Sequence, residues 1–308
     1  MGHFSETFEN QLSDAYPQDV VRQITQDWQY ADLPEQPGQQ IPYVRLNKGA
    51  DIGPVLYVPG FSEGIINKAT FAAELATRNV DLILPGQNRT GIMRDADNRR
   101  QATDSQARNY EAVLEAEGLE DASPHFISHS YGSLVLQSML ERAHKSRESQ
   151  YTDSTAILLA PSGLGSDSLP KLARRWVAML RSEQDTTTQS FPDLNGETSK
   201  ASAKTLLANI PRTIGEVRRL THDKLAVDEL VERTGRLIVM SYAQDAMYPT
   251  EFIQDAARDA VEAGAIWTVP YYSEVQKDTG IYGGTGAVHD DEQFNPKRVA
   301  NAALQFLS

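Results

Sequence analysis

The chain has 308 residues, of which 40% are hydrophobic and 23% charged, as in soluble globular proteins built on one large core or two smaller ones. Its formal net charge of −13 disfavours binding to nucleic acid or to an anionic membrane surface. Because it contains no cysteine, disulfides, thiolate catalysis and cysteine-ligated zinc are excluded.

Short apolar segments that resemble buried strands alternate along the chain with segments of helical spacing. The predicted strands cover residues 54–58, 80–85, 125–128, 154–161, 236–243 and 265–271. The predicted helices cover residues 67–78, 101–117, 132–144, 250–263 and 296–307. This alternation predicts an α/β fold with a mostly parallel sheet covered by helices on both faces. Residues 41–47 are a candidate for an antiparallel strand at its edge.

The alternation is interrupted once, between Gly163 and Gly235, where the sequence has helical spacing throughout most of its length. We therefore expect a helical cap over residues 163–234, inserted into an α/β core of residues 41–162 and 235–308. Residues 1–40 are expected to be an N-terminal extension that packs on this core.

The N-terminal segment has acidic residues where a secretory signal peptide needs a basic and then an apolar stretch. No run in the sequence approaches the ~18 apolar residues of a membrane-spanning helix. We expect a cytoplasmic protein without an integral membrane segment.

Ligands of a parallel α/β sheet bind beyond the carboxyl ends of its strands, so polar residues at those ends are the candidates for chemistry. Ser130 lies in "SHSYG", between a predicted strand and a predicted helix. Small neighbours fit a sharp elbow that exposes a nucleophilic serine. The loose pattern is weak by itself, and the strand before it and the helix after it give it weight.

Two further residues could complete the chemistry of a serine nucleophile. Asp245 follows the predicted strand 236–243 and could orient a histidine, although most loop aspartates only cap helices or turns. His289 lies in a glycine-rich loop before the last helix, where it could act as a general base. The alternative is a solvated loop histidine beside acidic residues.

A fourth candidate is the segment "VPGFSEG", residues 58–64, which directly follows a predicted strand. The backbone N–H groups of Phe61 and Tyr131 are the expected donors to a developing oxyanion. The alternative is an ordinary Pro-Gly turn.

The order of these features is an oxyanion loop, a serine, an aspartate and a histidine, each after a strand. In this order the sequence resembles the α/β-hydrolase superfamily over about residues 41–307. The resemblance implies an esterase- or lipase-like serine hydrolase with a helical cap. The chain departs from it at Pro59-Gly60, where His-Gly is common, at Ser128, where glycine is usual, and in the long stretch 272–288.

The predicted reaction is cleavage of a carboxylic ester through an acyl-enzyme on Ser130, with no metal or organic cofactor. Candidates for contact with a hydrophobic ester substrate are Ser62, Trp176 and Met247. An apolar stripe on the first cap helix suggests an apolar substrate group, although such stripes more often pack against a core. It consists of Leu169, Leu172, Trp176, Met179 and Leu180.

Several alternatives stay open at this point. The bond could be a thioester, a lactone or an amide, and the same three residues serve acyltransferases and cofactor-free haloperoxidases. A non-catalytic ligand-binding protein on this fold is the alternative from another class. The sequence also leaves open a homo-oligomer through the cap or the N-terminal segment.

Overall fold

A computed structural model describes residues 4–33, 36–86, 100–146, 151–165, 168–184, 207, 210–242, 245–249, 253–268 and 289–307. Residues 185–206 of the expected cap, the long stretch 272–288, and parts of the predicted helix 250–263 and strand 265–271 lie outside these residues.

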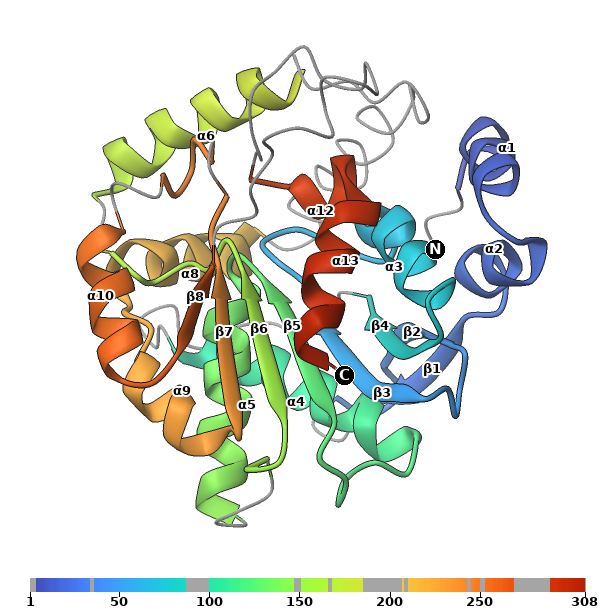
Figure 1. Cartoon of the computed structure of the whole chain (residues 1–308), viewed down its shortest axis with the longest axis horizontal. Coiled ribbons are helices and arrows are strands. Elements are labelled where there is room, and N and C mark those ends of the chain that lie inside the picture. Colours follow the sequence, from blue (N-terminus) through green and yellow to red (C-terminus); the bar gives the residue numbers. More distant parts are fainter. Residues whose placement is uncertain are drawn as a thin grey trace.

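The centre of the molecule is an eight-stranded sheet in the order β1-β2-β4-β3-β5-β6-β7-β8 (Figure 1). The strands are β1 (Gln29–Asp32), β2 (Gln40–Leu46), β3 (Ile52–Val58), β4 (Val80–Pro85), β5 (His125–His129), β6 (Thr155–Leu159), β7 (Arg236–Met240) and β8 (Ile266–Thr268). β2 pairs antiparallel with both β1 and β4, and all other pairs are parallel. The predicted fold class is confirmed.

The strand expected at 41–47 is antiparallel as predicted, but its expected place at the sheet edge is wrong. β1 pairs with its outer side, with Ala31 opposite Ile41. β1 is short and polar, and only Ala31 is buried in it, so it has no apolar run that sequence patterns could detect.

Helices cover both faces of the sheet, because successive side chains of a buried strand point to opposite faces. In β6, Ile157 belongs to one hydrophobic cluster and Leu158 to the other. The first cluster includes residues of α1 (Glu6–Ala15), α2 (Gln18–Thr25), α3 (Ala69–Ala76) and α13 (Pro296–Leu307). The second includes residues of α4 (Arg100–Ala116), α5 (Gly132–Ser146), α9 (Val227–Arg233) and α10 (Gln254–Glu262).

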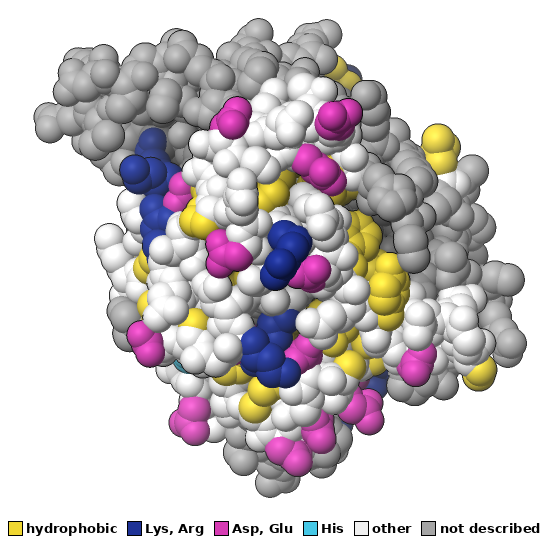
Figure 2. Space-filling model, turned by 90° about the vertical axis from the view of Figure 1, so that its right-hand side faces the viewer, with side chains coloured by type: hydrophobic (Ala, Val, Ile, Leu, Met, Phe, Trp, Pro, Cys, Tyr) yellow, Lys and Arg dark blue, Asp and Glu magenta, His cyan; other side chains and the backbone are white. Residues whose placement is uncertain are grey.

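The N-terminal residues are tied to the core in two ways. Phe8 and Leu12 of α1 and Ile24 of α2 are fully buried in the first cluster, and β1 adds a strand to the sheet. Figure 2 shows the side of the molecule where α1 and α2 lie, and acidic and basic side chains are interspersed on it. On this face, the described acidic side chains do not gather into one negatively charged patch.

The segment between β6 and β7 contains α6 (Leu169–Gln184), α8 (Ile210–His222) and α9. Of the apolar stripe expected on its first helix, Leu172 and Met179 are buried in the second cluster and Leu169 is 57% exposed. The side chain of Leu180 lies outside the described residues. The buried part of the stripe therefore packs against the core. Among the described helices, none combines the length and apolarity needed to cross a membrane.

The parallel register brings the carboxyl ends of four strands together. Val58 of β3 pairs with Ser128 of β5, and Leu159 of β6 lies between His129 of β5 and Met240 of β7. The segments that follow these strands therefore start side by side at one edge of the sheet.

Candidate active site

Ser130 lies in a sharp turn between β5 and α5, with a φ of 48°. This left-handed backbone conformation is uncommon for a residue with a side chain and is found at strained functional turns. The Ser130 N–H donates to the Leu159 carbonyl at 2.9 Å, which ties the turn to β6. A Cβ on Gly132 would lie 2.2 Å from the carbonyl oxygen of Val58, so only glycine fits there.

The residue two positions before the serine, Ser128, is fully buried, at the position where the resemblance led us to expect glycine. Its hydroxyl lies 3.1 Å from the hydroxyl of Ser133 in the first turn of α5. This hydrogen bond satisfies both buried hydroxyls, which explains how the turn accommodates a serine.

The structure brings Ser130, His289 and Asp245 together, and we call them the Ser–His–Asp cluster. His289 Nε2 lies 3.0 Å from Ser130 Oγ, and His289 Nδ1 lies 2.8 Å from Asp245 Oδ2. All three residues are buried. An ionised Asp245 can only accept, so it favours the proton on Nδ1 and leaves Nε2 as the acceptor for the serine hydroxyl.

Asp245 is itself fixed by the backbone that follows it. Its Oδ1 accepts the N–H groups of Met247 at 2.7 Å and Tyr248 at 2.8 Å. One carboxylate oxygen therefore holds the loop and the other holds the imidazole ring. The arrangement fixes the orientation of His289 as well as its tautomer.

Ser130 Oγ has a second hydroxyl neighbour, Ser162, which follows β6. The two oxygens are 3.4 Å apart, and Ser162 Oγ donates to Tyr248 Oη at 3.0 Å. The Ser162 N–H also donates to the Ser130 carbonyl at 3.1 Å. Ser162 and Tyr248 were not among the residues predicted from the sequence, although both lie close to predicted strand ends.

The segment expected to form an oxyanion loop lies beside the elbow. The Phe61 ring packs edge-on against Tyr131 at 6.3 Å and against Trp176 of α6 at 5.5 Å between ring centroids. Arg175, next to Trp176, donates to the Met247 carbonyl at 3.5 Å. α6 therefore contacts both the Phe61 loop and the loop that carries Asp245.

The three residues expected to contact substrate lie in the loops and helix around the cluster. Ser62 is buried with a φ of 62°, directly after Phe61. Trp176 is half-buried and packs on Phe61, and Met247 is buried beside Asp245.

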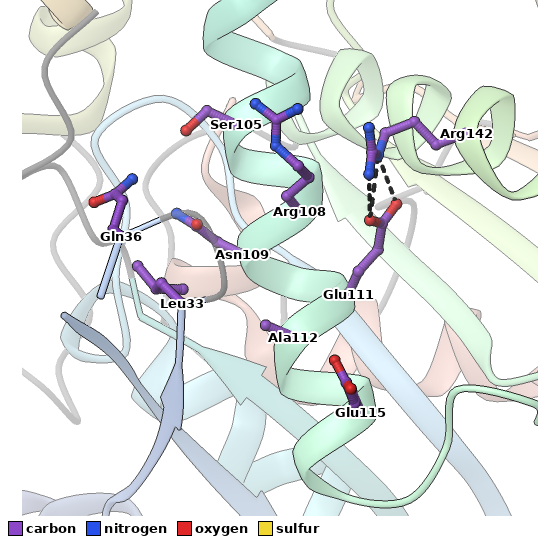
Figure 3. A pocket seen from close by; sticks show the side chains of 9 residues that line it. All are labelled: Leu33, Gln36, Ser105, Arg108, Asn109, Glu111, Ala112, Glu115 and Arg142. Atoms are coloured by element: carbon purple, nitrogen blue, oxygen red, sulfur yellow. Dashed lines mark hydrogen bonds and ion pairs between the residues drawn. The ribbon is translucent and has the colours of Figure 1, made fainter. Parts of the chain in front are cut away.

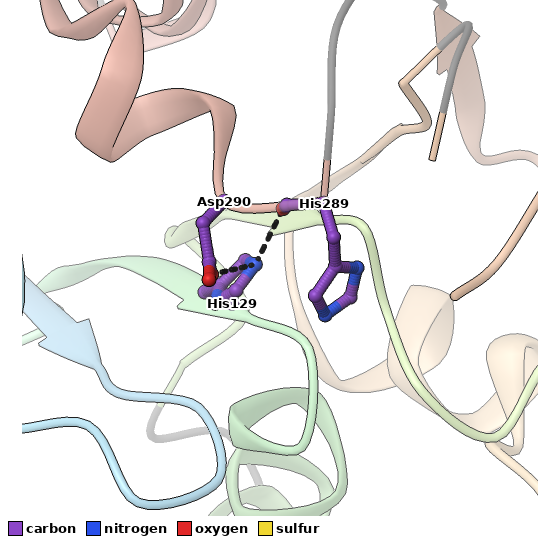
Figure 4. Close-up of side chains that lie close together, drawn as sticks. All are labelled: His129, His289 and Asp290. Atoms are coloured by element: carbon purple, nitrogen blue, oxygen red, sulfur yellow. Dashed lines mark hydrogen bonds and ion pairs between the residues drawn. The ribbon is translucent and has the colours of Figure 1, made fainter. Parts of the chain in front are cut away.

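A group of charged residues adjoins His289, formed by Glu63, Lys68, His129, Asp290 and Glu292; all are buried except the half-buried Asp290, and we call the group the buried charge network. Lys68 Nζ lies 2.9 Å from Glu63, 2.5 Å from Glu292 and 3.6 Å from Asp290. His129 Nδ1 lies 2.8 Å from Glu63 Oε1. Figure 4 shows the other ring nitrogen, Nε2, facing both the backbone carbonyl of His289 at 3.0 Å and Asp290 Oδ1 at 3.6 Å.

The protonation states in this network follow from its burial and its pairing. Burial alone lowers the pKa of His129, but the carboxylates of Glu292 and Glu63 outweigh it and raise the pKa to about 9. Burial raises the pKa of the Glu63 carboxyl, but His129 and Lys68 prevail and hold it well below its usual range. Burial opposes the Lys68 charge too, yet Glu292 and Glu63 raise the pKa of its ammonium. For the Asp290 carboxyl, burial raises the pKa.

The same acidic side chains and His129 are close enough to one another to ligate a cation. The Lys68 ammonium contacts three of them at 3.6 Å or less, so a positive charge of the chain itself is already present. The residues therefore do not fit a resident metal ion.

A separate pocket of about 220 Å³ lies along α4, away from the cluster (Figure 3). Its lining includes Arg142 of α5, which pairs with Glu111 at 3.0 Å. The lining contains no member of the Ser–His–Asp cluster, and we assign it no role in the chemistry.

No family model matches the chain, and no curated protein matches it in sequence. Solved structures do match. A thermophilic esterase from Thermogutta terrifontis has a TM-score of 0.59 at 18% identity, over 91% of this chain and 97% of that one. A serine hydrolase from Cycloclasticus zankles has 0.58 at 13% identity, over 91% and 96%. The N-formylmaleamic acid deformylase of Pseudomonas putida S16 has 0.56 at 12% identity, over 90% and 99%.

The chain has the α/β-hydrolase fold. At these identities the likeness shows the fold alone, and activity has to be argued from the site. In this fold the elbow serine precedes the acid and the histidine in the chain, and the cluster follows that order.

Proposed function

We propose that the protein is a serine hydrolase that cleaves a carboxylic ester through an acyl-enzyme on Ser130. The observation that carries the proposal is the hydrogen-bonded chain from Ser130 Oγ to His289 Nε2 and from His289 Nδ1 to Asp245. The positive φ of Ser130 supports it, because such backbone strain is typical of the sharp strand-to-helix turn that carries a nucleophilic serine.

In the first step Ser130 Oγ forms a bond to the carbonyl carbon while its proton passes to His289 Nε2. The tetrahedral intermediate collapses as the bond to the alcohol oxygen breaks, and the imidazolium returns the proton to that oxygen. Water then attacks the acyl-enzyme by the same route and releases the acid. Asp245 stabilises the imidazolium formed in each step.

The N–H groups of Phe61 and Tyr131 are our proposed donors to the oxyanion. Both follow strand ends at the same edge of the sheet, and the two side chains pack on each other. Removal of one such donor typically costs about 10²–10³ in rate, so this loop matters as much as the cluster.

We propose that residues 163–234 act as a cap on a core of residues 41–162 and 235–308. The packing of Trp176 on Phe61 supports this, because it brings α6 against the proposed oxyanion loop. Phe61, Trp176 and Met247 then offer an apolar wall to a hydrophobic acyl or alcohol group, and Ser62 a polar contact. A cytoplasmic location stays a prediction.

The test is hydrolysis of p-nitrophenyl esters of increasing chain length by the wild-type protein and by Ser130→Ala and His289→Ala. Ser13→Ala is the matched control, since Ser13 is an exposed residue of α1. We expect turnover in wild type and control only, and turnover in all four proteins would refute the assignment. Thioesters, lactones and an N-formyl compound belong in the panel, the last because one structural neighbour is a deformylase.

A further inference from the structure

His129 directly precedes the proposed nucleophile, yet its side chain lies in the buried charge network and not against Ser130. It is the last residue of β5 and is 1% exposed. A buried histidine at this place needs partners for both ring nitrogens, because an unpaired polar group is costly there.

Both ring nitrogens of His129 face hydrogen-bond acceptors. Nδ1 lies 2.8 Å from the Glu63 carboxylate, and Nε2 lies 3.0 Å from the backbone carbonyl oxygen of His289. Neither acceptor can donate, so each contact requires an N–H on the ring. The geometry therefore indicates an imidazolium, with both nitrogens protonated.

The two partners of His129 each belong to a different part of the proposed active site. Glu63 Oε2 accepts the N–H of Gly60 at 2.6 Å, directly before Phe61. His289 supplies the proposed general base. The His129 ring therefore links the proposed oxyanion loop after β3 to the backbone of His289. His129 is also the residue next to the proposed nucleophile.

The rest of the network keeps this ring in place. Glu63 also pairs with Lys68, which pairs with Glu292 of α12 (Asp291–Phe294). Glu292 is fully buried, and its other oxygen accepts the hydroxyl hydrogen of Tyr242 at 3.0 Å. Two cations and two anions therefore alternate from His129 to Glu292, which offsets the cost of burying each charge.

We propose, on the basis of the function above, that His129 is a positioning residue that acts as a cationic clamp between the oxyanion loop and the general base. It does not touch substrate. Its N–H groups fix the Glu63–Gly60 turn and the His289 carbonyl relative to Ser130, so that the base and the oxyanion donors keep their geometry.

The clamp has a defined dependence on pH. The groups that face His129 are Glu63 from the loop after β3, Lys68 from η1 (Ile66–Lys68), and Asp290 and Glu292 at α12, with the His289 ring 5.0 Å away. When the imidazolium loses a proton, one ring nitrogen can no longer donate, so the hydrogen bond to either Glu63 or the His289 carbonyl is lost. Because the pKa of His129 is raised to about 9, the clamp should open as the pH rises through that value.

The test compares kcat and KM of His129→Ala and His129→Gln on one p-nitrophenyl ester. We expect His129→Ala to lower kcat about 10²-fold while KM changes less than about threefold. The glutamine amide can still donate to the His289 carbonyl, so His129→Gln should recover part of the loss. His125→Ala is the matched control, since His125 starts the same strand and should leave kcat unchanged.

A folded His129→Ala protein with wild-type kcat would overturn the clamp. If that variant does not fold, the pH dependence of the wild-type protein provides the test. Its rate of reaction with a fluorophosphonate should fall as the pH rises through about 9, while its circular dichroism stays unchanged. A rate that stays constant to about pH 10 would also overturn it. Loss of turnover in Ser130→Ala with full turnover in His129→Ala would refute the clamp alone, whereas turnover in Ser130→Ala would refute the proposed function.

Discussion

Gly132→Ala should disturb the turn at Ser130 more than the addition of a single methyl group suggests. The added Cβ would lie 2.2 Å from the Val58 carbonyl oxygen and 2.8 Å from that of Pro59, whereas ordinary contacts begin at 3.4 Å. Either α5 or the end of β3 must therefore move by about 1 Å, and β3 leads directly into the proposed oxyanion loop.

Such a shift separates the nucleophile from its partners. A misplacement of about 1 Å can cost about 10² in rate, and overpacking of this kind costs about 1–3 kcal/mol of stability. We expect Gly132→Ala to show both losses, measured as kcat for ester hydrolysis and as the midpoint of urea unfolding.

Gly235→Ala is the matched control for this experiment. A Cβ there would lie 2.3 Å from the Thr152 carbonyl oxygen, a clash of the same kind at the start of β7, the end opposite the site. It should lose similar stability and keep the kcat of its folded fraction. If the folded Gly132→Ala protein keeps kcat within about threefold of wild type, the close packing of the elbow does not control the chemistry.

Three further predictions follow from the site. Asp245→Asn should lower kcat about 10³–10⁴-fold in steady-state assays, because an amide facing His289 Nδ1 favours the wrong tautomer; a loss below about tenfold would contradict this role. The free energy of unfolding should be highest in the pH range where Glu63 is ionised and His129 is protonated, and the midpoint of urea unfolding measured against pH would test this. The raised pKa of His129, from 6.5 to about 9, contributes about 3 kcal/mol below pH 6.5 that is lost as the pH rises through 9, and a flat profile there would count against it. The lowered pKa of Glu63 contributes stability above its ordinary value of 4.5 that is lost on acidification below it. Trp176→Ala should raise KM for long-chain esters about tenfold more than for acetate esters, and equal effects would remove it from the substrate wall.

The central sheet could be predicted from the sequence because its parallel strands are continuous apolar runs. β6 (Thr155–Leu159) is buried along its whole length and lies inside the strand expected at 154–161. β1 could not be found in this way, since three of its four residues are exposed. Ser130, Asp245 and His289 could be selected because ligands of a parallel sheet bind beyond the carboxyl ends of its strands, and the sequence shows which segments follow strands.

The buried charge network could not be predicted in the same way. Lys68 and Glu292 are 224 positions apart in the chain, and each by itself reads as an ordinary surface residue. Only the packing of α12 against η1 brings them together. The role of His129 likewise depends on a carbonyl 160 residues away, which no local pattern contains.

The most direct test of the proposed nucleophile is reaction of the intact protein with a fluorophosphonate, read by mass spectrometry with Ser130→Ala beside it. We expect one adduct on the wild-type protein and none on the variant. If the folded wild-type protein forms no adduct, or if the variant is labelled equally, Ser130 is not an activated nucleophile and a ligand-binding role on this fold takes precedence.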